Sequence, residues 1–250
     1  MEDSGKSIGQ KQLKCNEPTG SELLSYMHVL YGIFLYSKFA YRSANAILEE
    51  AMDNEPRVHI VDFQIAQGSQ WVPLIQSLAR RPGGPPFLCI TGIDDSESVF
   101  AREAGIEIVA QRLCQLAESC GMPFEFHNAA IYSSEVDFQH LSIRPDEALA
   151  VNFPYILHHV PDKSVTTENN WDRILGLIKS LSPKVVTLLE QESNTNTSPF
   201  IPRFLEMLDY YMAMFASIDA ARPRDDKERI SAEQHCVARD SQHGGLRRFR

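Results

Sequence analysis

Residues 57–71, RVHIVDFQIAQGSQW, constrain the fold of this chain more than any other stretch, because a strand pattern runs directly into a turn and a helix. Three β-branched residues form a short apolar run that ends at Asp62, which is typical of a parallel strand covered on both faces. Ser69 is the expected N-cap of a helix in which apolar residues recur at helical spacing from Trp71 to Ala79. A strand, a turn and a helix make the first half of a βαβ unit, so we expect a parallel sheet.

The alternation of strand and helix patterns continues along the chain. The expected strands are residues 57–62, 87–93, 124–127, 147–152 and 184–190, and the expected helices cover about 20–30, 37–51, 71–79, 106–120, 171–181 and 200–218. Alternation at this spacing predicts a doubly wound α/β domain. The two helices before the first strand are expected to cover the sheet edge or to belong to a larger helical cap.

The composition narrows the class of protein. With 250 residues, of which 43% are hydrophobic, the chain has enough material for one sizeable core. Its formal net charge of -9 argues against independent binding to nucleic acid, which needs Lys and Arg massed on one face, and fits protein partners better. The five cysteines lack CxxC spacing and are expected to be reduced thiols in the cytosol or nucleus. Neither a signal peptide nor a membrane-spanning run is visible, so we expect no membrane association.

The candidate ligand pocket lies at the carboxyl ends of the strands, where open parallel sheets bind their ligands. Its expected residues are Asp62, Gln64, Gly68, Asp94 and Asn152. A nucleoside cofactor requires a glycine-rich turn after the first strand and an acid after the second, and Asp94 or Asp95 could supply the acid. In the turn, however, Gly68 is the only glycine, and Gln64 and Ala66 would project side chains toward a cofactor. We therefore expect no cofactor, and either a structural turn or a pocket for a different ligand.

Two pairs of polar residues resemble catalytic groups. His158 and His159 could act as a general base or as metal ligands, but adjacent side chains diverge and no third ligand has suitable spacing. A hydrogen-bonded loop pair is the favoured interpretation. Glu190 and Glu192 could work as paired carboxylates, although two acids beside a strand end are more often solvated or helix-capping. We therefore expect no catalytic residue, no metal site and no enzyme activity.

The most aromatic helix is expected after Ser198 and Pro199, which form an N-cap and N1 pair. Its aromatic stripe comprises Phe200, Phe204, Tyr211 and Phe215. A stripe at helical spacing is expected to pack on the sheet, and part of it could instead form a surface for a protein partner.

Several long motifs, in order along the chain, resemble the GRAS family of plant transcriptional regulators. They are VHIVDFQIAQGSQW, TGIDDS, VNFPYILHHVPDKSV and SPKVVTLLEQESNTNTSPFIPRFLEMLDYYMAMFASIDA. The family's VHIID motif is matched here by Val58, His59, Ile60, Val61 and Asp62. Residues 198–240 resemble the opening of the PFYRE region, and RPRDDKERISAEQHCVARD resembles the scarecrow-like branch associated with phytochrome A signalling.

The resemblance implies a Rossmann-like, methyltransferase-type parallel sheet flanked by helices, with a partial N-terminal helical cap. Four regions are expected: a polar lead at 1–12, a partial cap with the end of the first leucine-rich region at 13–54, an incomplete GRAS α/β core at 55–240, and an unstructured basic tail at 241–250. The core would hold the VHIID motif, the second leucine-rich region and the start of the PFYRE region. Because most of the first leucine-rich region and the closing SAW region are not recognisable, we expect a product truncated at both ends.

The resemblance also implies a function. It points to a nuclear, and also cytoplasmic, regulator of transcription in plant signalling or development that contacts other transcription factors or GRAS proteins and does not bind DNA sequence-specifically by itself. The alternative is an S-adenosylmethionine-dependent small-molecule methyltransferase or a ligand-binding relative. The strand, turn and helix around Asp62 permit that alternative, and the missing glycines disfavour it.

Overall fold

The structure is a computed structural model that describes residues 35–94, 105–131, 135–157, 170–190, 199–227 and 229–230. Its strands are β1 (Arg57–Asp62), β2 (Phe87–Asp94), β3 (Phe124–Ala130), β4 (Ala148–Pro154) and β5 (Val185–Leu189). Its helices are α2 (Leu35–Ala51), α3 (Trp71–Leu78), α5 (Gly105–Ser119), the short 3-10 helix η2 (Phe138–His140), α6 (Asn170–Leu181) and α7 (Phe200–Ala221).

The strands form one parallel sheet in the order β3-β2-β1-β4-β5. This order runs outward from β1 in both directions, which makes the domain doubly wound and confirms the predicted Rossmann-like sheet. Strand β3 extends to Ala130, three residues beyond the predicted 124–127, because it pairs with β2 as far as Asp94. The sequence pattern of β3 did not predict these last residues, because pairing with β2 holds them in the strand.

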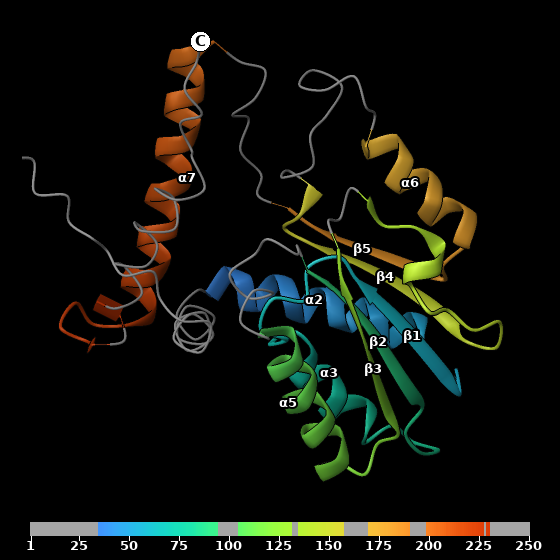
Figure 1. The fold of residues 1–250 in the computed structure, drawn as a ribbon. Coiled ribbons are helices and arrows are strands. Elements are labelled where there is room, and N and C mark those ends of the chain that lie inside the picture. The colour runs from blue at the N-terminus through green and yellow to red at the C-terminus, as the bar shows by residue number, and fades with distance from the viewer. Residues whose placement is uncertain are drawn as a thin grey trace, which may run out of the picture.

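Helices cover both faces of the sheet (Figure 1). On one face, α2, α3 and α5 pack on the strands around the fully buried ring of Trp71. On the other face, α6 and the chain around η2 cover a second cluster, in which the rings of Phe63 and Phe153 stack with centroids 4.3 Å apart. Helix α2 also contacts the edge strand β5, as expected for a helix that covers the sheet edge. The two apolar clusters make the sheet the centre of the fold.

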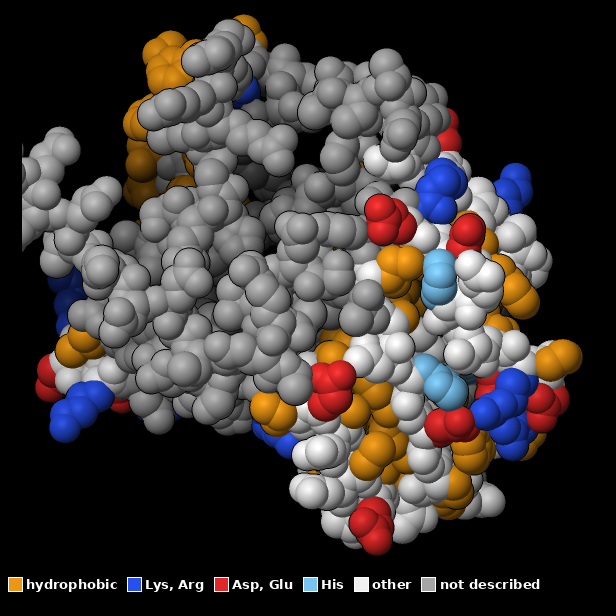
Figure 2. Space-filling view, viewed as in Figure 1, with side chains coloured by type: hydrophobic (Ala, Val, Ile, Leu, Met, Phe, Trp, Pro, Cys, Tyr) orange, Lys and Arg blue, Asp and Glu red, His pale blue; other side chains and the backbone are white. Residues whose placement is uncertain are grey.

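Helix α7 differs from the expectation. It contacts α2, and none of its residues belongs to either core cluster. Phe200, Phe204 and Phe215 are 64%, 54% and 43% exposed, so the prediction that this stripe packs on the sheet is wrong for these three residues. Helical spacing defines an apolar face, but it does not determine which surface covers that face. Figure 1 shows α7 extending away from the sheet, and Figure 2 shows hydrophobic side chains at the upper left, where α7 lies.

Two helix starts also differ from prediction. Gln70, not Ser69, is the N-cap residue of α3, and it makes no side-chain cap bond because its amide is used elsewhere. Pro199 precedes α7 as its N-cap residue and is not its first helical residue. No helix among the described residues is long and apolar enough to cross a membrane. The predicted polar lead and basic tail lie outside the described residues.

Candidate functional site

Asp62, the last residue of β1, lies at the centre of the predicted pocket, and neighbouring side chains use both of its carboxylate oxygens. Its Oδ2 accepts a hydrogen bond of 2.8 Å from Nε1 of Trp71. Its Oδ1 accepts hydrogen bonds from Nδ2 of Asn152 at 3.2 Å and from the backbone nitrogen of Gln64 at 3.3 Å. Asp62 is 1% exposed and Asn152 is fully buried. The structure therefore brings Asp62 and Asn152 together as predicted, but inside the protein.

Asn152, in β4, extends this set of hydrogen bonds toward two helices and β5. Its Oδ1 accepts a hydrogen bond of 2.7 Å from the hydroxyl of Thr187, and its Nδ2 donates to Oε1 of Gln70 at 3.0 Å. The backbone carbonyl of Gln70 accepts a hydrogen bond of 2.7 Å from Nδ2 of Asn45 in α2. We call this set the carboxyl-end network; its members are Asn45, Asp62, Gln70, Trp71, Asn152 and Thr187.

The carboxyl-end network occupies the position where doubly wound sheets hold a cofactor. Ligands bind such sheets at the crevice where the strand order reverses, which here is between β1 and β4. Asp62 and Asn152 are register partners across that crevice, and their side chains hydrogen-bond to each other. The members of the network lie on or beside β1, β4, β5, α2 and α3, so their hydrogen bonds join these elements. Buried polar groups that satisfy one another stabilise a unique packing.

The turn after β1 closes the neighbouring part of the crevice. The backbone nitrogen of Ile65 donates a hydrogen bond of 3.2 Å to the carbonyl oxygen of Ile93 in β2, and the Ile65 side chain is 3% exposed. A Cβ atom added to Gly92 would lie 3.1 Å from Ile65 and 2.7 Å from Phe126. Sequence reasoning singled out Gln64 and Ala66 as obstacles, but the residue that folds over the end of β2 is Ile65. Both neighbours of Ile65 are half-buried.

Gly68 serves helix packing. Its φ of +69° lies in the left-handed region, and a Cβ atom added there would lie 2.8 Å from Cγ1 of Val109 in α5. Glycine therefore allows the turn to approach α5 closely. This contact accounts for the single glycine of the turn without a cofactor.

The remaining predicted site residues divide into two groups. Asp94 ends β2 in register with Ala130 of β3. Oε1 of Glu190 accepts a hydrogen bond of 2.9 Å from the backbone nitrogen of Leu157, which ties the end of β5 to the chain after β4. The other candidates, Asp95, His158, His159 and Glu192, lie outside the described residues.

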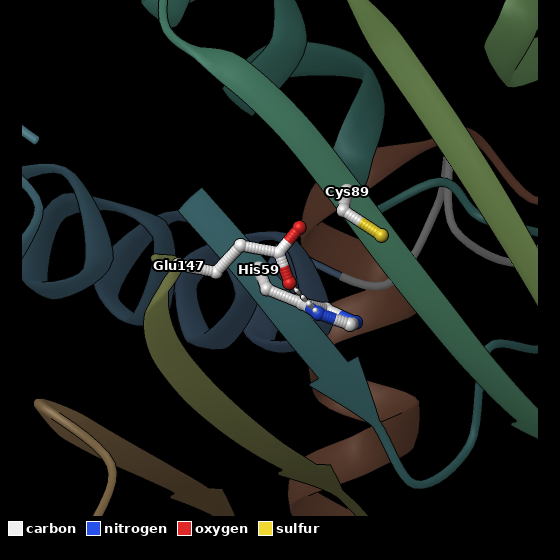
Figure 3. Close-up of side chains that lie close together, drawn as sticks. All are labelled: His59, Cys89 and Glu147. Carbon is white, nitrogen blue, oxygen red and sulfur yellow. Dashed lines mark hydrogen bonds and ion pairs between the residues drawn. The ribbon is translucent and has the colours of Figure 1, made fainter. Parts of the chain in front are cut away.

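A second polar cluster, which sequence reasoning missed, lies on the opposite face of the sheet. His59 of the VHIVD motif is fully buried, and its Nδ1 lies 2.7 Å from Oε2 of Glu147. Figure 3 shows these two side chains beside Cys89 of β2. Burial lowers the pKa of His59 below its usual 6.5, although the hydrogen bond and charge of Glu147 act in the opposite direction. Burial opposes ionisation of Glu147, but hydrogen bonds from the Arg144 backbone and from His59 outweigh it and lower its pKa.

Thr91 links His59 to the backbone. Its Oγ1 lies 2.8 Å from Nε2 of His59 and 3.0 Å from the carbonyl oxygen of Leu141. A hydroxyl has one proton, so it donates either to His59 or to Leu141. Neutral His59 donates to Glu147 and accepts from Thr91, whereas protonated His59 donates through both nitrogens and Thr91 then donates to Leu141. The direction of the Thr91 hydrogen bonds therefore depends on the protonation state of His59.

Two arginines surround this cluster. Arg144 donates to both carboxylate oxygens of Glu125, at 2.8 and 2.9 Å, and lies 3.2 Å from Glu147. Arg57 pairs with Asp146 at 3.0 Å. A sequence signal for the cluster exists, because polar residues alternate with apolar ones in β2 and β3, which places Cys89, Thr91, Glu125 and His127 on one face.

Comparison with known proteins gives sequence matches over nearly the whole chain. A sequence model of the GRAS domain family matches residues 2–243. Scarecrow-like protein 13 from Arabidopsis thaliana is 65% identical over 240 residues, which are 96% of this chain and 45% of that protein. Scarecrow-like transcription factor PAT1 from the same plant is 59% identical over 240 residues, which are 96% of this chain and 49% of that protein. The chain therefore spans about half the length of these curated relatives.

A solved structure has the same fold. The crystal structure of SCL7 from Oryza sativa superposes with a TM-score of 0.75 at 37% identity, over 90% of this chain and 61% of that chain. The parallel sheet and its helices are thus shared with a protein of related sequence.

Proposed function

This chain belongs to the GRAS domain family, and from that premise we propose that it works in a nuclear regulator of transcription that acts through protein contacts and not through catalysis. Relatives named as a scarecrow-like protein and a scarecrow-like transcription factor support the proposal. Its partners are other transcription factors or GRAS proteins. Because the chain spans about half of those relatives, the proposal concerns the part that it contributes to such a protein.

One structural observation carries the proposal. The crevice between β1 and β4, which a cofactor enzyme keeps open, is filled by the hydrogen bonds of Asp62, Gln70 and Asn152. Catalysis needs groups directed at a substrate, whereas these side chains bind one another. The same fold is then a scaffold for surfaces that other proteins contact.

Helix α7 supplies such a surface. Phe204, Leu208 and Met212 lie at helical spacing and are 54%, 44% and 60% exposed. Exposed apolar patches of this kind mark protein-protein interaction sites. The net charge of -9 disfavours direct contact with DNA phosphates, so recruitment to DNA by a partner fits the chain better than direct binding.

A tethering experiment tests the proposed function. The chain is fused to an unrelated DNA-binding domain, and expression of a reporter with the matching DNA site is measured in plant cells. We expect the fusion to change reporter expression, and we expect Phe204→Glu and Leu208→Glu together to reduce that change. Glu206→Gln, an exposed polar change on the same helix, is the matched control.

Two outcomes would contradict the proposal. One is a fusion that leaves the reporter unchanged although it is present in the nucleus. The other is sub-micromolar, sequence-dependent binding of DNA by the purified chain at physiological salt, because DNA contact would then replace partner contact as the basis of action.

A further inference from the structure

Three potential metal-ligand atoms converge on the face of the sheet opposite the carboxyl-end network. They are Sγ of Cys89 in β2, a carboxylate oxygen of Glu125 and a ring nitrogen of His127, both in β3, and all lie within 4.8 Å of one another. We propose that Cys89, Glu125 and His127 bind a divalent transition-metal ion of the Zn²⁺ type. Thiolate, imidazole and carboxylate are the ligands that such an ion takes in proteins, with water in the fourth position.

The sheet itself brings these residues together. Cys89 and Glu125 are register partners of β2 and β3, and His127 follows Glu125 by two residues, which puts both on the same face. Strand β3 is at the edge of the described sheet. The side chains of Glu125 and His127 are 34% and 26% exposed, while Cys89 is fully buried. The proposed site therefore combines two partly exposed ligands with one buried ligand.

The separation of two of the atoms already suits a metal ion. Nε2 of His127 lies 3.3 Å from Oε1 of Glu125. Tetrahedral bonds of about 2.0–2.2 Å to nitrogen and oxygen place two such ligands about 3.3–3.6 Å apart. Nε2 of His127 is buried from solvent and makes no hydrogen bond to any residue that the structure describes, so a ligand for this nitrogen would satisfy it. The sulfur lies within 4.8 Å of both atoms, so a side-chain adjustment would bring it to a bond of about 2.3 Å.

His59 and Glu147 form an overlapping group with Cys89, but they are less suited to bind the ion. Nδ1 of His59 pairs with Glu147 at 2.7 Å and Nε2 pairs with Thr91 at 2.8 Å, so both ring nitrogens are in use. Binding through His59 would break a buried hydrogen bond, whereas among the described residues Nε2 of His127 contacts only Glu125, which is itself a proposed ligand, and has no hydrogen bond to lose. The group formed by Cys89, Glu125 and His127 is therefore the proposed site.

The surrounding charges are compatible with a cation. Burial, followed by the negative charges of Glu147 and Glu125, raises the pKa of the Cys89 thiol to about 12. The acids that oppose a free thiolate attract a metal ion, and when the ion binds the sulfur the thiol releases its proton to solvent. Arg144 donates to both oxygens of Glu125, and each oxygen keeps a second lone pair for the ion while the guanidinium fixes the carboxylate.

Cobalt substitution tests the site with the whole chain. Co²⁺ takes tetrahedral Zn²⁺ sites and gives a sulfur-to-metal charge-transfer absorption only when a thiolate is bound. We expect this absorption to saturate at one ion per chain and to disappear when Zn²⁺ is added. Cys89→Ser should abolish the absorption, and Cys114→Ser, which changes an exposed thiol on α5, should leave it unchanged.

Two further variants keep the test decisive if Cys89→Ser fails to fold by circular dichroism. His127→Gln and Glu125→Gln, both half-exposed on an edge strand, should each weaken Zn²⁺ binding at least about tenfold. His140→Gln and Glu118→Gln are the matched controls and should bind as the unchanged chain does. The proposal is overturned if the unchanged chain gives no thiolate absorption, if folded Cys89→Ser retains it, or if His127→Gln binds Zn²⁺ as tightly as the unchanged chain.

Discussion

Nε1 of Trp71, the first residue of α3, donates a hydrogen bond of 2.8 Å to Oδ2 of Asp62, the last residue of β1, and both side chains are buried. The indole thereby satisfies a buried acid at the end of the sheet where nucleotide-binding proteins of this topology hold their ligand. Trp71→Phe keeps an aromatic ring but removes the donor and part of the buried indole, so we expect it to lower the free energy of unfolding by at least about 1–3 kcal/mol. Asp62→Ala leaves Nε1 of Trp71 and one of the two Nδ2 hydrogens of Asn152 without an acceptor and should cost about 2–5 kcal/mol. Urea unfolding followed by circular dichroism measures both, and an Asp62→Ala chain as stable as the unchanged one would contradict this assignment.

The filled crevice predicts that the chain does not bind S-adenosylmethionine. A cofactor held in the low micromolar range gains about 8 kcal/mol on binding, and here it would have to displace the buried side chain of Ile65 and separate Asp62 from Asn152. Isothermal titration should therefore show no binding in that range, for either the unchanged chain or Asp62→Ala. Binding by the unchanged chain and not by the variant would establish a functional pocket and favour the methyltransferase alternative.

The two glycines Gly68 and Gly176 should respond to alanine in opposite directions. Gly68 has a φ of +69°, and its added methyl group would lie 2.8 Å from Val109, so Gly68→Ala should destabilise the chain by about 1–3 kcal/mol. Gly176 lies inside α6 with no atom within 4 Å of an added Cβ, so Gly176→Ala should stabilise it by about 0.5–1 kcal/mol. Thermal unfolding of both variants measures the two changes in stability. Equal effects of the same sign would show that close packing against α5 is not what Gly68 provides.

Local pattern was sufficient for the strand, turn and helix around Asp62, but not for the contacts within the site. The apolar run before Asp62 and the helical spacing after Trp71 predicted a strand, a turn and a helix, and the structure has all three. The hydrogen bond between these two residues depends on a side-chain direction that spacing does not determine. The partners His59 and Glu147 are 88 residues apart, and only the alignment of β1 with β4 brings them together. A sequence pattern reports which face a residue lies on, whereas tertiary register decides its partner.

The exposed side of α7 predicts a surface that can be changed without loss of stability. Phe204, Leu208 and Met212 are largely exposed, and surface substitutions usually shift stability by about 0.5 kcal/mol or less. Changing all three to Gln should therefore leave the unfolding midpoint near that of the unchanged chain while reducing binding of the dye ANS and self-association. Ile218→Gln, at a fully buried position of the same helix, should by contrast be clearly destabilising. A triple variant that unfolds as readily as Ile218→Gln would show that the stripe is part of the core.

The buried pair of His59 and Glu147 predicts that stability falls on acidification. Burial lowers the pKa of His59 in the folded chain, whereas in the unfolded chain the imidazole has its usual pKa of about 6.5. Just below pH 6.5, His59 is therefore protonated in the unfolded chain and neutral in the folded chain, so unfolding takes up a proton. The free energy of unfolding should then decrease as pH falls from about 6.5 toward the lower folded pKa, by at most about 1.4 kcal/mol per pH unit for one group. The lowered pKa of Glu147 acts in the same direction, below the usual 4.5 of a glutamate.

The charged groups that act on His59 are Glu147, which favours protonation, and His127 and Arg144, which oppose it. His59→Asn removes the titrating ring, so its stability should vary less steeply with pH between about 7 and 5 than that of the unchanged chain. Denaturant unfolding at a series of pH values, with a chelator present, measures both slopes. Burial would not be the dominant influence on His59 if the two chains showed the same slope, or if the unchanged chain became more stable on acidification.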